Sequence, residues 1–237
     1  MPNFSPPSSP RTWLAGRWAV VASALVLAIA SVVAGAAPVR AIPPGAVPVV
    51  VPVKRLPDSI EAVISGAAIR ALIALDEFVN AGNQDAFDLY RVYADRLAMP
   101  VAVALDLNVR ELQRSWADAD LPRQQAIIAG LTQLGVPYRL NTSIAFQSFD
   151  CSGLTSYAWG IAGIPLARSS RAQFYAAKPI KPEKAQLGDL VWRPGHVAMY
   201  LGVPGAVLQA PTEGRNVEIQ LMNERIASWV RYADPIE

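Results

Sequence analysis

After residue 57, apolar residues recur at helical spacing through about the first half of the remaining sequence. Asp58 and Glu61 have the spacing of a capping box, which marks the start of a helix. Apolar positions then recur every three or four residues, and the pattern returns from about 84 to 98 and from about 106 to 117. Stripes of this kind normally face a core. We therefore expect a small helical region over residues 58–120.

The pattern changes after a fourth helix, for which Asp120 is the expected N-cap and Gly135 is expected just past the end. A loop is expected over 141–149 and a further helix over 152–162. Short alternating segments follow, as in the strands of an antiparallel sheet. Helices first and antiparallel strands afterwards predict an α+β fold, with a second domain over 121–237. The predicted strands are 190–192, 197–201, 206–209 and 217–221.

Residues 18–39 form a charge-free and mostly apolar run behind two arginines. A basic head, an apolar middle and small residues at the end are typical of a secretory signal peptide. The run is also long enough to cross a bilayer, so residues 1–41 are expected to be a cleaved signal or an uncleaved membrane anchor. Under either interpretation the bulk of the chain is exported. The Pro- and Val-rich segment 42–57 is expected to be an extended linker.

Charge and cysteine content narrow the possible functions. The net charge is +2, but residues 1–41 contain three arginines and no acid, so the remainder has no excess of basic residues. A nucleic-acid partner is therefore not expected. Cys151 is the only cysteine and His196 the only histidine. An internal disulfide is thus impossible, and no metal site built on cysteine and histidine is expected.

The surroundings of Cys151 suit nucleophilic chemistry. It falls at the first turn of the expected helix, where free N–H groups and the helix dipole favour a thiolate and lower the thiol pKa. Gly153 lets other backbone approach closely, as an oxyanion site beside the nucleophile requires. The alternative is a buried structural cysteine, which is the commoner fate of a free thiol.

His196 opens a segment with the alternation of a strand. His196, Ala198 and Tyr200 fall on one face, and the apolar residues between and after them fall on the other. The apolar set is expected to face the core, so His196 points to the opposite side. A partly apolar groove there would hold the imidazole near its switching pKa. The alternative is a histidine that only hydrogen-bonds backbone at a strand end.

Six segments, in this order, resemble the signature of the NlpC-type (NlpC/p-sixty) cell-wall cysteine peptidases. The resemblance extends over about residues 123–221 and does not cover the helical region before it. The segments are LGVPY at 134–138, DCSGLTSYAW at 150–159, LARSSRAQ at 166–173, LGDLV at 187–191, HVAMYLG at 196–202 and QAP at 209–211.

The resemblance implies a papain-like fold, with a catalytic helix packed on an antiparallel sheet. It also implies hydrolysis of the bond from D-γ-glutamate to a diamino acid, typically meso-diaminopimelate, in peptidoglycan stem peptides outside the cytoplasm. Cys151 takes the position of the nucleophile, His196 that of the base and Gln209 that of a polar third residue. No cofactor or metal is implied. Five positions match residues that line or shape the family's cleft: Tyr138, Asp150, Ser152, Arg168 and Ser170.

Departures from the family pattern leave alternatives open. The third position is often histidine in this family, whereas Gln209 is neutral, and Leu-Ala-Arg replaces Leu-Pro-Arg at 166–168. If 204–205 forms a two-residue turn, Gln209 pairs opposite Tyr200 and Glu213 lies opposite His196. Either a bulge or strong curl then brings Gln209 nearer, or Glu213 is the orienting residue; Gln209 is favoured because it directly precedes Ala-Pro at 210–211. Two rival functions also remain. One is a papain-like amidase that cuts the sugar–peptide bond, and the other is a non-catalytic module that binds the cell wall.

Overall fold

A computed structural model describes residues 57–236 of the chain, and these belong to one compact unit. The predicted signal peptide or anchor over 1–41 lies outside the described residues, as does the predicted linker except for Pro57. Within 57–236, none of the helices combines the length and the apolar composition that a bilayer span requires.

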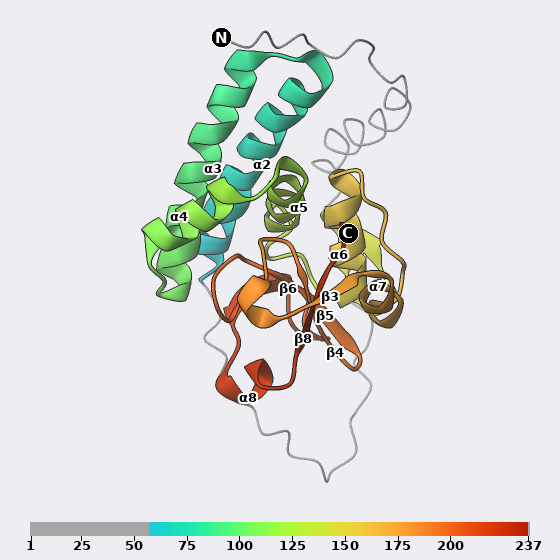
Figure 1. The fold of residues 1–237 in the computed structure, drawn as a ribbon. Helices are drawn as coiled ribbons and strands as arrows, with labels where there is room; N and C mark the ends of the chain where they lie inside the picture. Colours follow the sequence, from blue (N-terminus) through green and yellow to red (C-terminus); the bar gives the residue numbers. More distant parts are fainter. Residues whose placement is uncertain (1–56, 237) are drawn as a thin grey trace, which may run out of the picture. The chain divides into compact units, whose positions relative to one another are not determined.

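The described residues begin with two long helices, α2 and α3, which pack along each other and are followed by the shorter α4 (Figure 1). Pro57 is the N-cap of α2 and no side chain caps that end, so the predicted capping box of Asp58 and Glu61 is wrong. Gly82 ends α2 in the left-handed conformation, and the side chain of Asn83 caps α3. The bounds are α2 Asp58–Ala81, α3 Gln84–Leu105 and α4 Val109–Asp118.

Helix α4 fixes the turn that follows the central strand of the sheet. The indole N–H of Trp116 donates to the carbonyl of Leu201 at 2.8 Å, and the Ser115 hydroxyl donates to the carbonyl of Gly202 at 2.7 Å. Gly202 has a φ of 89°, and a Cβ there would lie 2.3 Å from the Ser115 oxygen. The helical region therefore determines the shape of this turn.

Two further helices, α5 and α6, pack against each other beside the sheet. As predicted, the Asp120 carboxylate caps α5 by accepting the N–H of Arg123 at 3.0 Å. Helix α6 begins at Cys151, one residue earlier than predicted, and two very short strands precede it within the predicted loop. The bounds are α5 Leu121–Leu131, β1 Ser143–Ile144, β2 Ser148–Phe149, α6 Cys151–Ile161, α7 Ser170–Ala176, η1 Pro182–Lys184 and α8 Glu224–Ala227.

The main sheet has six antiparallel strands in the order β3-β8-β4-β5-β6-β7. Strands β4 to β7 correspond to the four predicted segments. Strands β3 and β8 were not predicted, because three or four residues rich in charge and proline carry no alternation. The bounds are β3 Lys178–Ile180, β4 Leu190–Arg193, β5 His196–Tyr200, β6 Ala206–Gln209, β7 Glu218–Leu221 and β8 Arg231–Asp234.

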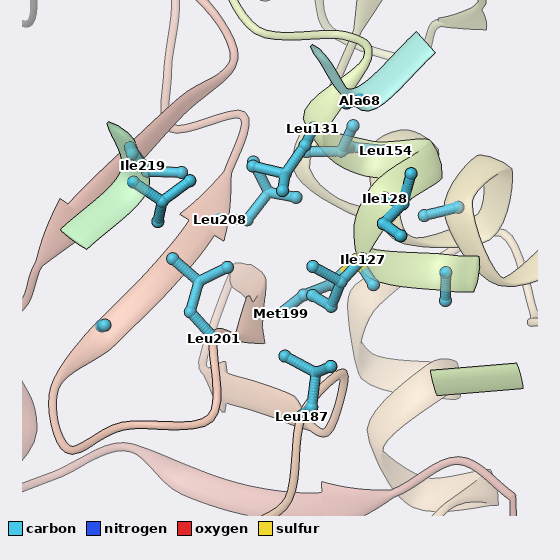
Figure 2. Close-up of a cluster of buried hydrophobic side chains, with 14 of the residues drawn as sticks. Ala68, Ile127, Ile128, Leu131, Leu154, Leu187, Met199, Leu201, Leu208 and Ile219 are labelled. Carbon is cyan, nitrogen blue, oxygen red and sulfur yellow. The ribbon is translucent and has the colours of Figure 1, made fainter. Parts of the chain in front are cut away.

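The main core lies between the sheet and helices α5 and α6 (Figure 2) and continues among α2, α3 and α4. Ile127 and Leu131 of α5 and Leu154 of α6 are fully buried there, opposite Met199 of β5 and Leu208 of β6. A smaller cluster, which includes Ala198, Tyr200 and Tyr232, covers the other face of the sheet. The predicted alternation of β5 is therefore confirmed, although both faces are buried.

Arg123 ties α5 to the sheet through two buried carboxylates. It lies 2.5 Å from Asp189, directly before β4, and 2.6 Å from Asp234 at the end of β8. Removal of one member from such a buried cluster typically costs about 3–5 kcal/mol, because a charge is left without its partner. The chain thus has the predicted α+β fold, a helix on an antiparallel sheet as in papain-like proteins.

Candidate active site

Asp150 fixes the start of α6. One of its oxygens accepts the backbone N–H of Gly153 at 2.6 Å, and the other accepts that of Asn141 at 2.8 Å. Arg168 donates to both oxygens, at 2.9 and 2.7 Å. Burial would raise the pKa of Asp150, but the hydrogen bonds from Arg168 and Gly153 outweigh it and hold the pKa below its ordinary value. An ionised carboxylate therefore locks the helix turn that begins with Cys151.

Cys151 and His196 come from adjacent elements, because α6 packs on β5. The sulfur interacts with the backbone N–H of Val197, the residue that follows His196. Cys151 is 9% exposed and His196 8% exposed, so both lie just below the surface. Within residues 57–236 no hydrogen bond joins the two side chains, and the imidazole bonds Gln209 instead.

The thiol of Cys151 is less acidic than its place at a helix start predicts. Burial raises its pKa, the N–H of Val197 opposes that effect, and the negative charge of Asp150 adds to it. The net direction is upward, so the predicted lowering is wrong. The reason is local, since the carboxylate that caps α6 acts on the same buried sulfur that the helix dipole would stabilise.

The orientation of His196 follows from the groups around Gln209. Nε2 of the imidazole lies 2.8 Å from Oε1 of Gln209, while the amide nitrogen donates to Gln220 at 2.8 Å and to Glu218 at 3.1 Å. Because the amide nitrogen faces two acceptors, its oxygen faces the ring. Nε2 must therefore carry the proton, and Nδ1 has the free lone pair.

His196 is a neutral imidazole at pH 7. Burial lowers its pKa to about 4; the hydrogen bond to Gln209 opposes this, and the positive charge of Arg193 adds to it. Because the thiol pKa is raised at the same time, the two side chains form a neutral pair near neutral pH. This differs from the ion pair that a lowered thiol pKa would have produced.

The connection between β5 and β6 determines which residue orients His196. The strands are joined by a four-residue loop, 202–205, rather than by a two-residue turn, as their pairing shows. The longer loop shifts the register by two residues and places Gln209 diagonally across from His196 on the same face. Gln209, and not Glu213, therefore makes the hydrogen bond to the imidazole.

Glu218 of β7 lies behind Gln209 and is a site residue that sequence reasoning missed. It pairs with Gln209 in the sheet, is 8% exposed, and accepts hydrogen bonds from Gln209 and Arg215. The Glu218 carboxylate is thus connected to the imidazole of His196 through the side chain of Gln209. Only the register of β6 against β7 reveals it, because no local motif contains both residues.

Three of the five predicted cleft residues form one network. The Ser152 hydroxyl donates to Asp150 at 3.2 Å and accepts from Arg168 at 3.0 Å, and Arg168 also donates to the carbonyl of Thr142. Asp150 and Ser152 are buried, whereas the Arg168 side chain is half exposed. The network holds the loop before β1 against the start of α6.

Tyr138 and Ser170 differ in their relation to this network. Burial and the nearby Cys151 and Asp150 raise the pKa of Tyr138, so its hydroxyl lies in the same electrostatic environment as the sulfur. Ser170 is the first residue of α7, whose N-cap is Ser169. The structure brings Tyr138 to the site, and in the described part of the chain the Ser170 side chain makes no hydrogen bond.

Gly153 does permit a close approach, but the approaching group is not an oxyanion donor. A Cβ at this position would lie 2.1 Å from the carbonyl oxygen of Thr142. The Ser143 hydroxyl donates to the Gly153 carbonyl at 2.9 Å. The predicted close approach of backbone at Gly153 is therefore confirmed, and the missing side chain makes room for the loop that Arg168 holds.

Comparisons with known proteins identify the family of this chain. The model of the NlpC/P60 family matches residues 135–232. A probable endopeptidase of Corynebacterium glutamicum is 30% identical over 154 residues, which is 63% of this chain and 72% of that protein. The chain belongs to the NlpC/P60 family.

Other relatives share only part of their length with this chain. Peptidoglycan endopeptidase RipA of Mycolicibacterium smegmatis is 26% identical over 187 residues, which is 69% of this chain but 35% of RipA. A crystal structure of an NlpC/P60 family protein from Bacillus cereus is 31% identical, covering 47% of this chain and 39% of that chain, with a TM-score of 0.43.

Proposed function

We propose that this protein is a cysteine endopeptidase that hydrolyses the bond from D-γ-glutamate to a diamino acid, typically meso-diaminopimelate, in peptidoglycan stem peptides. The observation that carries the proposal is the hydrogen bond between His196 and Gln209 beside Cys151. Membership of the NlpC/P60 family and relatives named as peptidoglycan endopeptidases support the substrate class. The chemistry requires no metal or cofactor.

The proposed reaction begins from the neutral pair. The sulfur of Cys151 attacks the γ-carbonyl carbon while its proton passes to Nδ1 of His196. The tetrahedral intermediate then collapses, and the amine of the diamino acid leaves with that proton. Water, activated by the same imidazole, hydrolyses the thioester, releases the γ-carboxylate and restores the thiol.

Gln209 holds the ring in the tautomer that this sequence of steps needs. Its oxygen accepts from Nε2, so Nδ1 is free to take a proton, and the same hydrogen bond strengthens when the ring becomes an imidazolium. The backbone N–H groups of Cys151 and Ser152 act on the sulfur at the helix start. We assign the N–H of Cys151 as a donor to the oxyanion.

The cleft residues divide into two roles in this proposal. Tyr138 and Arg168 contact the stem peptide, because both retain exposed surface beside the sulfur. Asp150 and Ser152 hold Arg168 and the helix start in position. Ser170 lines the rim at the start of α7.

The location follows from the substrate, which lies outside the cytoplasm. We propose that residues 1–41 direct export, as a cleaved signal or as an anchor through 18–39, and that 42–57 is a spacer. Residues 58–120 form the helical region that precedes the peptidase domain over 121–237.

The test is digestion of purified sacculi by the wild-type protein and by Cys151→Ala, with the products identified by mass spectrometry. Fragments cut between glutamate and the diamino acid, absent with the variant, support the proposal. Release of whole stem peptides would instead identify the amidase.

One observation favours a second candidate, the non-catalytic wall-binding module. A buried thiol with a raised pKa, without a hydrogen bond to the imidazole, is also what an inactive relative of a peptidase would contain. Wild-type protein that sediments with sacculi but releases no fragment would establish this candidate and end the first.

A further inference from the structure

A cavity lies between α7, the end of β3 and the start of β8, and neither Cys151 nor His196 lines it. Its volume is about 370 Å³. Aromatic rings and prolines supply most of its apolar surface, and two cations complete it. The residues used below are Phe174, Tyr175, Lys181, Arg231 and Tyr232.

Arg231 is held in this cavity by aromatic rings rather than by an acid. Its guanidinium carbon lies 4.5 Å from the ring centre of Phe174 and 4.8 Å from that of Trp192. These two rings stack on each other at 4.7 Å. A guanidinium that stacks on rings keeps its N–H donors free at its edge, in a fork that fits a carboxylate.

The donors of Arg231 are available to a ligand. Its one hydrogen bond to another side chain within 57–236 is a long one, 3.5 Å, to the Tyr175 hydroxyl. No ion pair joins Arg231 or Lys181 to a carboxylate in the described part of the chain. Among the described residues no acid lines the cavity, and Glu183, the nearest acid to Lys181 in sequence, is not one of the lining residues.

The remaining surface suits the apolar part of a small anionic ligand. Tyr175 is 61% exposed, and Arg171 lies 5.7 Å from its ring centre and adds a third cation. An open aromatic ring beside fixed positive charge binds a molecule that presents both carbon surface and a negative group. A carboxylate on an aliphatic amino acid has this character.

The cavity lies at the same end of the sheet as the candidate active site. Arg231 of β8 pairs with Trp192 of β4, which pairs in turn with Val197 of β5. These three residues share the face of the sheet that α7 covers, whereas His196 lies on the other face. Two strand spacings, about 10 Å, therefore separate the backbone of Arg231 from that of Val197, whose N–H contacts the sulfur of Cys151. An extended peptide covers that distance in about three residues.

We propose that Arg231 and Lys181 bind a carboxylate of the stem peptide two or three residues from the bond that is cut, while Tyr175 packs on the aliphatic part of the same residue. This inference rests on the proposed function. It assigns Arg231 to substrate selection, so that the enzyme distinguishes a free carboxylate from an amidated one at a single position of the stem.

The test uses synthetic stem tetrapeptides of one sequence in which the carboxylates of glutamate, of diaminopimelate and of the terminal alanine are amidated one at a time. We expect one amidation to lower kcat/KM of the wild type about 10-fold or more, mainly through KM, since a charge-assisted hydrogen bond is lost. Arg231→Gln should lower kcat/KM for the free-acid peptide and remove the difference between the free-acid and the amidated peptide. Lys181→Gln should make that difference smaller.

Arg225→Gln is the matched control, because Arg225 is an exposed arginine of α8 that does not line the cavity. Thermal unfolding of each variant confirms that the fold is intact. Wild-type protein that cuts all peptides equally, or an Arg231→Gln variant that keeps the full discrimination, overturns the inference. Wild-type protein that cuts none of the peptides contradicts the proposed function instead.

Discussion

Acid should destabilise this protein through His196 in particular. The imidazole is neutral in the fold because burial lowers its pKa from 6.5 to about 4. In the unfolded chain the same group takes up a proton as the pH falls through 6.5. The unfolded state therefore binds more protons than the folded state between pH 6.5 and about 4, and the free energy of unfolding falls with the pH across that window.

The size of the effect follows from the difference between the two pKa values. Each unit of pKa corresponds to 1.36 kcal/mol, so the full difference is worth about 3 kcal/mol. Between pH 7 and pH 4.5 most of this, about 2–3 kcal/mol, should be lost. Above about pH 7.5 neither state carries the proton, and the contribution of His196 no longer changes.

The assay is urea unfolding of the wild type and of His196→Gln at pH 7, 6, 5 and 4.5. The variant lacks the titrating group, while Asp150, Asp189 and the other acids titrate in both proteins. The difference between the two curves therefore isolates His196. Glutamine at position 196 does not reproduce the hydrogen bond of the imidazole at any pH. The resulting loss of stability is the same at each pH, so it does not alter the slope of the stability difference against pH. Parallel stability curves, or a wild type that gains stability over the variant in acid, would refute the reasoning.

Three further results are expected. Alkylation of Cys151 by iodoacetamide should accelerate only above about pH 8.5, the ordinary thiol pKa, because burial raises the pKa; a plateau extending to pH 6 would contradict the neutral pair. Gln209→Ala should lower kcat about 10-fold, as the loss of one hydrogen bond predicts. Glu218→Gln should lower kcat less, because the amide of Gln209 keeps an acceptor. Equal effects of the two variants in steady-state kinetics would contradict this order. Gly153→Ala should destabilise the fold, since the added Cβ would lie 2.1 Å from a carbonyl oxygen. Gly160→Ala in the same helix has open space around its Cβ and should stabilise the fold by about 0.5–1 kcal/mol. Similar melting temperatures for the two variants would contradict the clash at Gly153.

Local sequence was sufficient to place the two reactive side chains on their elements. Cys151 starts a helix because the carboxylate of Asp150 before it accepts the N–H of Gly153, and that relation spans four residues. The faces of β5 follow from strict alternation, which also spans only neighbours. Features of this kind can be predicted from the sequence, since each depends on residues a few positions apart.

The rest depended on contacts between residues distant in sequence. The loop 202–205 has four residues because α4 holds its start through Ser115, which lies 87 positions away from Gly202. That loop sets the register, and the register selects Gln209. The thiol pKa could not be predicted either, because it depends on how deeply the fold buries the sulfur and on where the capping carboxylate lies.

The position of Glu218 explains how a neutral residue can serve at the third site. An acid in contact with the imidazole would both orient the ring and raise its pKa. Here Gln209 orients the ring without charge, and the carboxylate behind it also accepts from Arg215. The ring keeps the low pKa that burial gives it and remains a base at every pH above about 4. Orientation and charge are divided between two strands, and the neutral pair follows from the burial of both Cys151 and His196.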